Sequence, residues 1–279
     1  MNEALFISKL KLTCQLSIID NRSVSEEILK ELMSISNSSK VKSRIGIVLG
    51  ELENVAVSEL TFNQCLRLVK RSNCPSGILE EAYKQWEGKH GEDYELMRII
   101  GGHLNTPTYI LSQIIVSYNW SNREITARNP NTPSADLEKC LEVDDDLDVL
   151  TAAAKNPSTP IEAIIALSKS EDPDRRWAAA CSPRLPARFL DGLVDDESED
   201  IFHQVLDNPN LAMESMVWAL YSGRHLSRIP DHLLSQTRKR LERIEAEPGM
   251  RSQVESLKAA AELGIRPSIE LINLNEINI

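Results

Sequence analysis

The sequence predicts an all-α protein built from stacked two-helix repeats of about 26 residues, with a helical cap at its C-terminal end. A proline-containing corner recurs at nearly constant spacing, apolar residues follow each corner at helical intervals, and small residues precede it. A two-helix unit this short cannot bury its apolar face alone, so such units stack on one another. We therefore expect an α-solenoid rather than a domain with one wide core.

The corner is clearest in the stretch "AAAKNPSTPIEAIIALSKS". Asn156 can adopt the left-handed conformation that closes a helix, and Pro157 cannot continue that helix. Thr159 is a good N-cap, Pro160 suits the first helical position, and Glu162 stands three residues after Thr159 as in a capping box. The stretch predicts a tight corner between two helices rather than a loop that carries chemistry.

The same corner recurs in "ARNPNTPSADLEKCL", "AACSPRLPARFLDGL" and "VLDNPNLAMESMVWAL". A degraded copy is "GGHLNTPTYILSQII", in which Leu104 replaces the first proline. Aligned on that position, the corners fall at residues 104, 130, 157, 183 and 209, so the steps are 26, 27, 26 and 26 residues. A period this regular is typical of a repeat protein.

Two helices per repeat follow from the apolar positions. The first, longer helix has apolar residues seven and ten positions after each anchor, namely Leu111, Leu137, Ile164, Leu190, Met216, Ile114, Cys140, Leu167, Leu193 and Ala219. The second helix ends at the next corner, with mostly apolar residues eight and four positions before the anchor, such as Leu96, Ile100, Val149, Ala153, Ile201 and Val205. Small residues in its last turn allow close stacking, namely Gly101, Ala127, Ala154 and Ala180.

This pattern resembles the leucine-rich repeat variant family, a relative of the HEAT and armadillo solenoids. The segments "ITARNPNTPSADL", "TAAAKNPSTPIEAIIAL" and "AAACSPRLPARFLDGL" carry the resemblance, which covers about residues 96–220. It implies a right-handed superhelix in which an α-helix can alternate with a shorter 3₁₀-like helix. Some relatives hold an iron–sulfur cluster on closely spaced cysteines, whereas no two of the five cysteines here are closer than nine residues. We expect no cofactor, and we expect Cys65 and Cys140 to be small core residues.

The repeats suggest three regions along the chain. These are irregular N-terminal helical repeats over residues 1–95, regular repeats over residues 96–221 and a C-terminal helical cap over residues 222–279. Proline-free copies are anchored near Arg22 and Val55. The cap predicts two longer helices separated at Gly249, the second ending at Gly264, and a charged helical pair of this kind closes a stack.

Composition limits the function classes. The net charge of −11, from 42 acidic and 31 basic residues, disfavours nucleic acid as a partner because an acidic chain repels phosphate backbones. No apolar run approaches the ~20 residues that span a bilayer, and the first residues lack the charged-then-apolar order of a signal peptide. An odd, scattered set of cysteines gives no disulfide framework. We therefore expect a cytoplasmic protein without a membrane partner.

A candidate binding surface follows from the helix geometry. Positions six and two before each anchor lie away from the buried stripe of the second helix, and along the repeats they change from basic through aromatic to acidic. The expected partner-binding residues on and beside this ridge are Arg98, Arg123, Arg128, Lys155, Arg176, Trp177, Phe202 and His203. Trp177 would be the anchor, since tryptophan and arginine often dominate interface energetics. The alternative is that these are ordinary solvated positions.

The sequence contains no motif that supports catalysis. It has no phosphate-binding glycine loop, no H-E-x-x-H and no G-x-S-x-G, and its five histidines, His90 among them, are scattered. The acidic run Asp144–Asp146 is expected to be a solvated turn. We expect a non-enzymatic scaffold that binds a protein or peptide. The alternative is a nucleic-acid-binding HEAT-like solenoid similar to the alkylpurine DNA glycosylases, with tryptophans such as Trp120, Trp177 and Trp218 near the lesion.

Overall fold

The computed structural model describes residues 3–20, 24–50, 55–88 and 93–266. All regular structure in these ranges is helical, which confirms the all-α prediction. The chain forms two compact units, Met1–Pro133 and Ser134–Ile279, and each is described by itself. The anchor expected near Arg22 and the histidine at position 90 lie outside the described residues.

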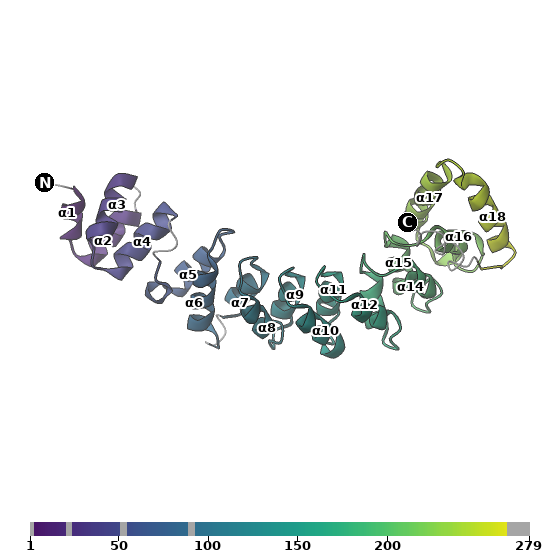
Figure 1. Ribbon diagram of the computed structural model, residues 1–279, viewed down its shortest axis with the longest axis horizontal. Helices are drawn as coiled ribbons and strands as arrows, with labels where there is room; N and C mark the ends of the chain where they lie inside the picture. The colour runs from purple at the N-terminus through teal and green to yellow at the C-terminus, as the bar shows by residue number, and fades with distance from the viewer. Residues whose placement is uncertain (1–2, 21–23, 51–54, 89–92, 267–279) are drawn as a thin grey trace, which may run out of the picture. The chain divides into compact units, whose positions relative to one another are not determined.

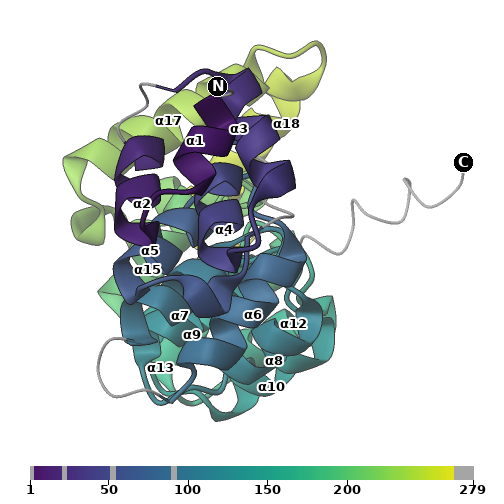
Figure 2. The ribbon, with the colours of Figure 1, turned by 90° about the vertical axis from the view of Figure 1, so that its left-hand side faces the viewer.

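The first unit contains nine α-helices and one short 3₁₀ helix in its described part (Figure 1). They are α1 (Glu3–Ser8), α2 (Leu12–Asp20), α3 (Glu26–Ile35), α4 (Ser39–Leu49), η2 (Val57–Glu59), α5 (Phe62–Val69), α6 (Ser76–Trp86), α7 (Asp93–Gly102), α8 (Thr108–Ile114) and α9 (Trp120–Arg128). Several helices pack on the next but one: α1 lies beside α3, α2 beside α4 and α7 beside α9 (Figure 1; Figure 2). One apolar cluster joins α1 to α4, and a second joins η2 and α5 to α8.

The second unit contains a further nine α-helices and one 3₁₀ helix over its described residues. They are α10 (Ser134–Val143), α11 (Leu147–Lys155), α12 (Ile161–Ser168), α13 (Pro173–Ala180), α14 (Ala187–Leu193), α15 (Glu199–Asp207), α16 (Met213–Tyr221), η3 (Leu226–Arg228), α17 (Asp231–Glu245) and α18 (Met250–Glu262). The predicted pair of C-terminal helices is confirmed, with left-handed glycines before α18 and after it (Gly249 φ 85°, Gly264 φ 75°). Both α17 and α18 pack against α16, whose residues 213–220 are all buried.

The positions expected to be apolar and buried are buried. Leu111, Leu137, Ile164 and Leu190 have no exposed surface, and Met216 is 2% exposed. The last turn of the second helices is closely packed: a Cβ added to Gly101 would collide with Oγ1 of Thr126 on α9. The helix lengths differ from the expectation, because α8, α10 and α12 have 7, 10 and 8 residues and α9, α11 and α13 have 9, 9 and 8. The second helices are α-helices, and the first helices are not consistently longer: α10 exceeds α11 by one residue, whereas α8 is shorter than α9.

The corner residues act differently from the prediction. Asn156 is extended (φ −67°, ψ 131°) rather than left-handed, and its Oδ1 accepts a hydrogen bond from the Ser158 amide at 2.8 Å. Thr159 does not cap the following helix; its hydroxyl donates to the carbonyl of Ala153 in the preceding helix at 2.6 Å. Pro160 is the N-cap of α12, where no side-chain capping bond forms. The Thr159 side chain therefore stabilises the end of α11 and not the start of α12.

Asparagine side chains also connect successive corners. Nδ2 of Asn208 donates to the carbonyls of Ala180 at 2.7 Å and Ser182 at 2.9 Å, while its Oδ1 accepts from the Asn210 amide at 2.9 Å. Asn129 makes the equivalent bonds, with Gly101 and His103 as acceptors, at 2.8 and 3.0 Å. These contacts span 26 and 28 residues. Each asparagine thus satisfies carbonyls of the preceding corner that its own chain segment leaves open.

We predict that Asn208→Asp destabilises the second unit by about 3 kcal/mol, because it replaces a buried donor with a carboxylate that faces two carbonyl oxygens. Thermal unfolding followed by circular dichroism measures the change. Asn73→Asp makes the same substitution at an exposed position and should have almost no effect. Equal unfolding midpoints for the two variants would contradict the structural role of Asn208.

Candidate functional site

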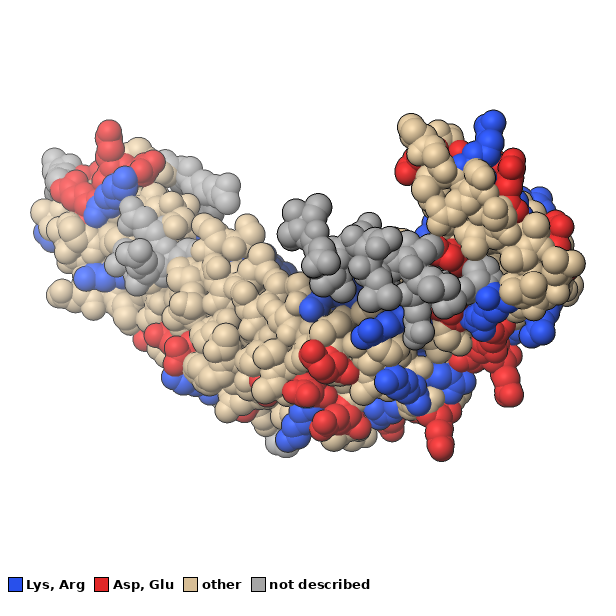
Figure 3. Space-filling view, turned by 45° about the vertical axis from the view of Figure 1, so that its right-hand side comes forward, with Lys and Arg blue, Asp and Glu red and all other residues tan. Residues whose placement is uncertain are grey.

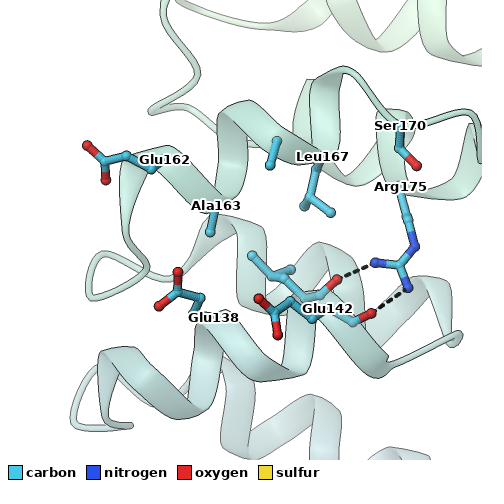
Figure 4. A pocket seen from close by; sticks show the side chains of 9 residues that line it. Glu138, Glu142, Glu162, Ala163, Leu167, Ser170 and Arg175 are labelled. Atoms are coloured by element: carbon cyan, nitrogen blue, oxygen red, sulfur yellow. Dashed lines mark hydrogen bonds between the residues drawn. The ribbon is translucent and has the colours of Figure 1, made fainter.

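A cleft of about 340 Å³ lies between α10 and α12 in the second unit (Figure 4). Its lining residues are Glu138, Leu141, Glu142, Glu162, Ala163, Ala166, Leu167, Ser170 and Arg175. We call this cleft the acidic groove, because glutamates from both helices stand at its rim above an aliphatic floor. Its volume lies in the range of ligand-binding clefts.

The helical spacing explains how the acidic groove forms. On α10, Glu138, Leu141 and Glu142 are three and four residues apart, so they share one face of the helix. On α12, the residues that face α10 include Ala163 and Ala166, whose small side chains leave space between the two helices. The floor beside them is closed by Leu141 and Leu167, which are 2% and 5% exposed. The hollow forms because the small side chains of Ala163 and Ala166 leave space above Leu141 and Leu167.

Arg175 of α13 closes one end of the acidic groove. Its guanidinium donates to the carbonyl oxygens of Leu141 and, at 3.2 Å, of Glu142 (Figure 4). It also donates to the carbonyl oxygen of Asp144, just after α10, at 3.0 Å. These carbonyls belong to the C-terminal end of α10, where backbone acceptors lack partners within the helix and a cation is favourable. Arg175 is therefore a structural cation, and its hydrogen bonds hold α13 against the end of α10.

The acidic groove carries net negative charge, because three glutamates line it together with one cation, Arg175. Glu138, Glu142 and Glu162 are exposed, and within the described residues none of them forms an ion pair. In Figure 4, Glu138 and Glu162 lie near the end of the groove opposite Arg175, while Glu142 lies between them and the arginine. The arrangement suits a ligand that combines positive charge with aliphatic side chains.

In the first unit, the predicted site residues have different roles. Arg98 is exposed on α7. Arg128 is also exposed and pairs with Glu124 one turn earlier, at 2.5 Å. Arg123 donates to the carbonyls of Ser117 and Tyr118, both at 3.0 Å, and so holds the turn that precedes α9. That partner binding involves these arginines stays a prediction, although Arg123 already has a structural role.

In the second unit, Phe202 is fully buried, so it cannot contact a partner in this conformation. Its ring packs against that of His225 at 5.1 Å between centroids, and the guanidinium of Arg228 lies 5.1 Å from its ring centroid. The neighbouring His203 is half-buried, with Nε2 hydrogen-bonded to the carbonyl of Arg228 at 2.6 Å. The sequence reasoning placed Phe202 beside the exposed ridge, whereas α15 turns it into the core. Its buried neighbour Ile201 shows that this helix is apolar on more than one stripe.

Two further predicted residues remain accessible in the second unit. Lys155 is exposed at the end of α11, and Trp177 is half-buried on α13. Their part in binding stays a prediction, because neither lines the acidic groove.

Arg176, by contrast, is a structural clamp rather than a free cation. It donates Nε and Nη2 to the two carboxylate oxygens of Asp196 at 2.7 and 3.2 Å, and Nη1 to the carbonyls of Ser170 and Glu171. The side chain of Asp196 is only 6% exposed. Burial opposes ionisation of Asp196, but hydrogen bonds from Arg176 and the Ser198 amide, with the arginine charge, hold its pKa below the ordinary value.

The Asp196 clamp predicts a pH dependence. Because the folded-state pKa lies below the ordinary 3.8, the carboxylate stabilises the fold at neutral pH, and this contribution is lost as the pH falls through the folded-state pKa. Asp196→Asn should therefore lower the free energy of unfolding by about 2 kcal/mol at pH 7, and this difference should shrink below about pH 4. Urea unfolding at several pH values measures it, with the exposed Asp145→Asn as control. A difference that stays constant down to pH 2.5 would rule out this role.

The acidic run also differs from the expected solvated turn. Asp144 is 7% exposed and accepts from the Asp146 amide at 3.1 Å. Asp146 is the N-cap of α11 and accepts from the amides of Asp148 and Val149 at 3.0 and 3.2 Å. Two of the three carboxylates therefore form the turn that begins a helix.

Four of the five cysteines are buried, and Cys14 is exposed. Cys65 and Cys140 are 0% and 5% exposed, as expected, and burial raises the pKa of Cys65 to about 11. Across the ranges that the structure describes, no group of three or more His, Cys, Asp or Glu side chains is placed to hold a metal ion. In the same ranges, every helix is too short or too polar to cross a membrane.

The acidic groove is not among the surfaces predicted from the sequence, which lie on the second helix of each repeat. The groove lies on first helices, and its signal is the pair Ala163 and Ala166 at positions that face glutamates of α10. Comparison of the chain with protein-family models, with curated proteins and with solved structures finds no match.

Proposed function

We propose that the protein is a non-enzymatic, right-handed α-solenoid scaffold that binds a peptide segment of a partner protein. The solenoid arrangement is supported by the regular corners and by asparagine bonds that connect residues 26 and 28 apart. Such bonds join each two-helix unit to its neighbour in the chain, as in other stacked repeats. Its scaffold role follows from the surface that this stacking forms.

The acidic groove is the observation that carries the proposal. Three glutamates without ion pairs in the described residues surround an aliphatic floor of about the size of one or two side chains. A peptide with lysine or arginine beside leucine-like residues would bury its apolar side chain on Leu141 and Leu167 and place its cations at the rim. Charge at the rim governs partner preference, and the floor supplies the buried contact.

The alternative of nucleic-acid binding has less support from the surface. On the described part of the face in Figure 3, acidic and basic side chains are interspersed, and the acidic residues do not leave one continuous basic surface. A duplex or single strand needs a basic track along its phosphates. We therefore assign the acidic groove to a cationic peptide.

A fluorescein-labelled nine-residue peptide of lysine and leucine tests the proposal by fluorescence anisotropy. The combined Glu138→Gln, Glu142→Gln and Glu162→Gln variant should weaken its binding about tenfold, since each rim charge contributes roughly 0.5 kcal/mol. Ala166→Trp should also weaken binding, because Ala166 is exposed and a larger side chain there fills the groove.

The matched control removes the same number of charges elsewhere. Glu242→Gln, Glu255→Gln and Glu262→Gln together alter exposed glutamates of α17 and α18 and should leave the affinity nearly unchanged. Equal loss in both triple variants would indicate attraction to net charge alone. Tight binding of a DNA oligonucleotide at low salt, weakening steeply with added salt, would favour the alternative function.

A further inference from the structure

A second cleft, of about 370 Å³, lies in the first unit between α4 and α5. Its polar lining consists of Arg44, Arg67, Arg71 and Gln64, and its apolar lining of Ile47, Val48 and Leu68. We call it the arginine cleft. It contrasts with the acidic groove, because its lining contains three arginines and no acidic residue.

The arginine cleft lies where the two apolar clusters of the first unit meet. Val48 packs against the cluster of α1 to α4, while Ile47 packs against the cluster of α5 to α8. Residues 44, 47 and 48 are three and four apart on α4, and residues 64, 67 and 68 are three and four apart on α5. Each set therefore shares one helix face. Arg71 lies two residues beyond the end of α5 and lines the same cleft.

Arg67 and Arg71 line the cleft without an acidic residue beside them in the lining. Arg71 donates both Nη1 and Nη2 to the carbonyl of Ile47, at 3.2 and 3.3 Å, which fixes the guanidinium across the cleft. A carbonyl is uncharged, and each terminal nitrogen retains a second hydrogen for a ligand. Arg67 is exposed on the neighbouring turn and forms no ion pair within the described residues. The guanidiniums of Arg67 and Arg71 therefore bring positive charge to the arginine cleft, and no acidic residue of the lining neutralises it.

The arginine cleft continues into a smaller one of about 250 Å³, which shares Arg44 and Gln64 with it. The acid there, Glu59, is already bonded to Lys40 at 3.5 Å and to the hydroxyl of Ser39 at 3.0 Å. Aliphatic side chains line both spaces, with Leu16 and Leu60 in the smaller one. An apolar lining beside the arginines suits a peptide, which has apolar side chains of its own, better than a free ion.

We propose that the arginine cleft binds a peptide segment that carries an oxyanion, either a phosphorylated side chain or a carboxylate, through Arg67 and Arg71. Guanidinium groups recognise phosphate and carboxylate oxygens with paired hydrogen bonds, and arginine clusters are a recurring means of reading acidic motifs in peptides. The aliphatic wall of Ile47, Val48 and Leu68 takes an apolar neighbour of the charged residue. The proposal extends the peptide-binding function to a second site of opposite charge.

Three labelled nine-residue peptides test the arginine cleft on the full chain by fluorescence anisotropy. They share one leucine-containing sequence and have phosphoserine, glutamate or serine at the central position. The phosphoserine peptide should bind at least tenfold more tightly than the serine peptide, with the glutamate peptide between them if carboxylates are also accepted. Inorganic phosphate added alone should compete only at much higher concentration than the peptide.

Arg67→Gln should weaken binding of the phosphoserine peptide at least fivefold, while Arg238→Gln, at an exposed position of α17, removes the same charge and should change it less than twofold. Circular dichroism should show both variants folded, which makes Arg67 a better test than Arg71, whose bonds to Ile47 also support the fold. Equal binding of all three peptides, equal loss in both variants, or binding of DNA in place of the peptides would overturn the proposal. The triple glutamine variant of the acidic groove should leave this binding unchanged, so the two sites can fail separately.

Discussion

Backbone carbonyls at the corners between helices need hydrogen-bond donors, and the packing of the helices depends on side chains that supply them from the next corner. At four of the five aligned corners the anchor is a proline, which carries no amide hydrogen, so the corner cannot satisfy all of its own acceptors. Asn129 and Asn208 provide the donors at two corners. Arg184 likewise donates hydrogen bonds to the carbonyls of Pro157 and Thr159, at 2.9 and 2.6 Å. Without these donors, close stacking would bury unpaired polar groups.

This constraint also determines which surfaces remain available for a partner. Three arginines of the second helices donate hydrogen bonds to backbone carbonyls of neighbouring turns, namely Arg123, Arg175 and Arg176. Two of the cations expected on the binding ridge, Arg123 and Arg176, are therefore already hydrogen-bonded, whereas Arg98 and Lys155 stay exposed. On α10 and α12, three glutamates form no ion pair within the described residues and surround the acidic groove. A charged side chain is therefore available to a partner where it makes no hydrogen bond to the backbone.

The helical content and the buried positions of the repeats could be predicted from the sequence, because apolar spacing and proline breaks are local signals. The hydrogen bonds made by the corner residues could not be predicted, because an asparagine side chain can end a helix in several ways. His103 shows why: it stands where Asn129 and Asn208 stand, and its Nδ1 accepts from the Asn105 amide at 3.0 Å while Nε2 donates to the carbonyl of Arg71 at 2.9 Å. At this corner the imidazole of His103 therefore takes the place of the asparagine side chain. The acidic groove was equally hidden, because a hollow depends on the sizes of side chains that meet from two repeats.

The short sequence distance bridged by the corner asparagines has a consequence for the order in which the chain folds. Asn129 and Asn208 reach back only 26 and 28 residues, so these contacts form without the closure of a long loop. Proteins rich in local contacts fold fast, and a stack with nearest-neighbour contacts can begin to form at any sufficiently stable unit and grow from it. A ribosome-bound chain can accordingly consolidate each helix pair soon after the following corner has emerged, before synthesis reaches the C-terminal helices.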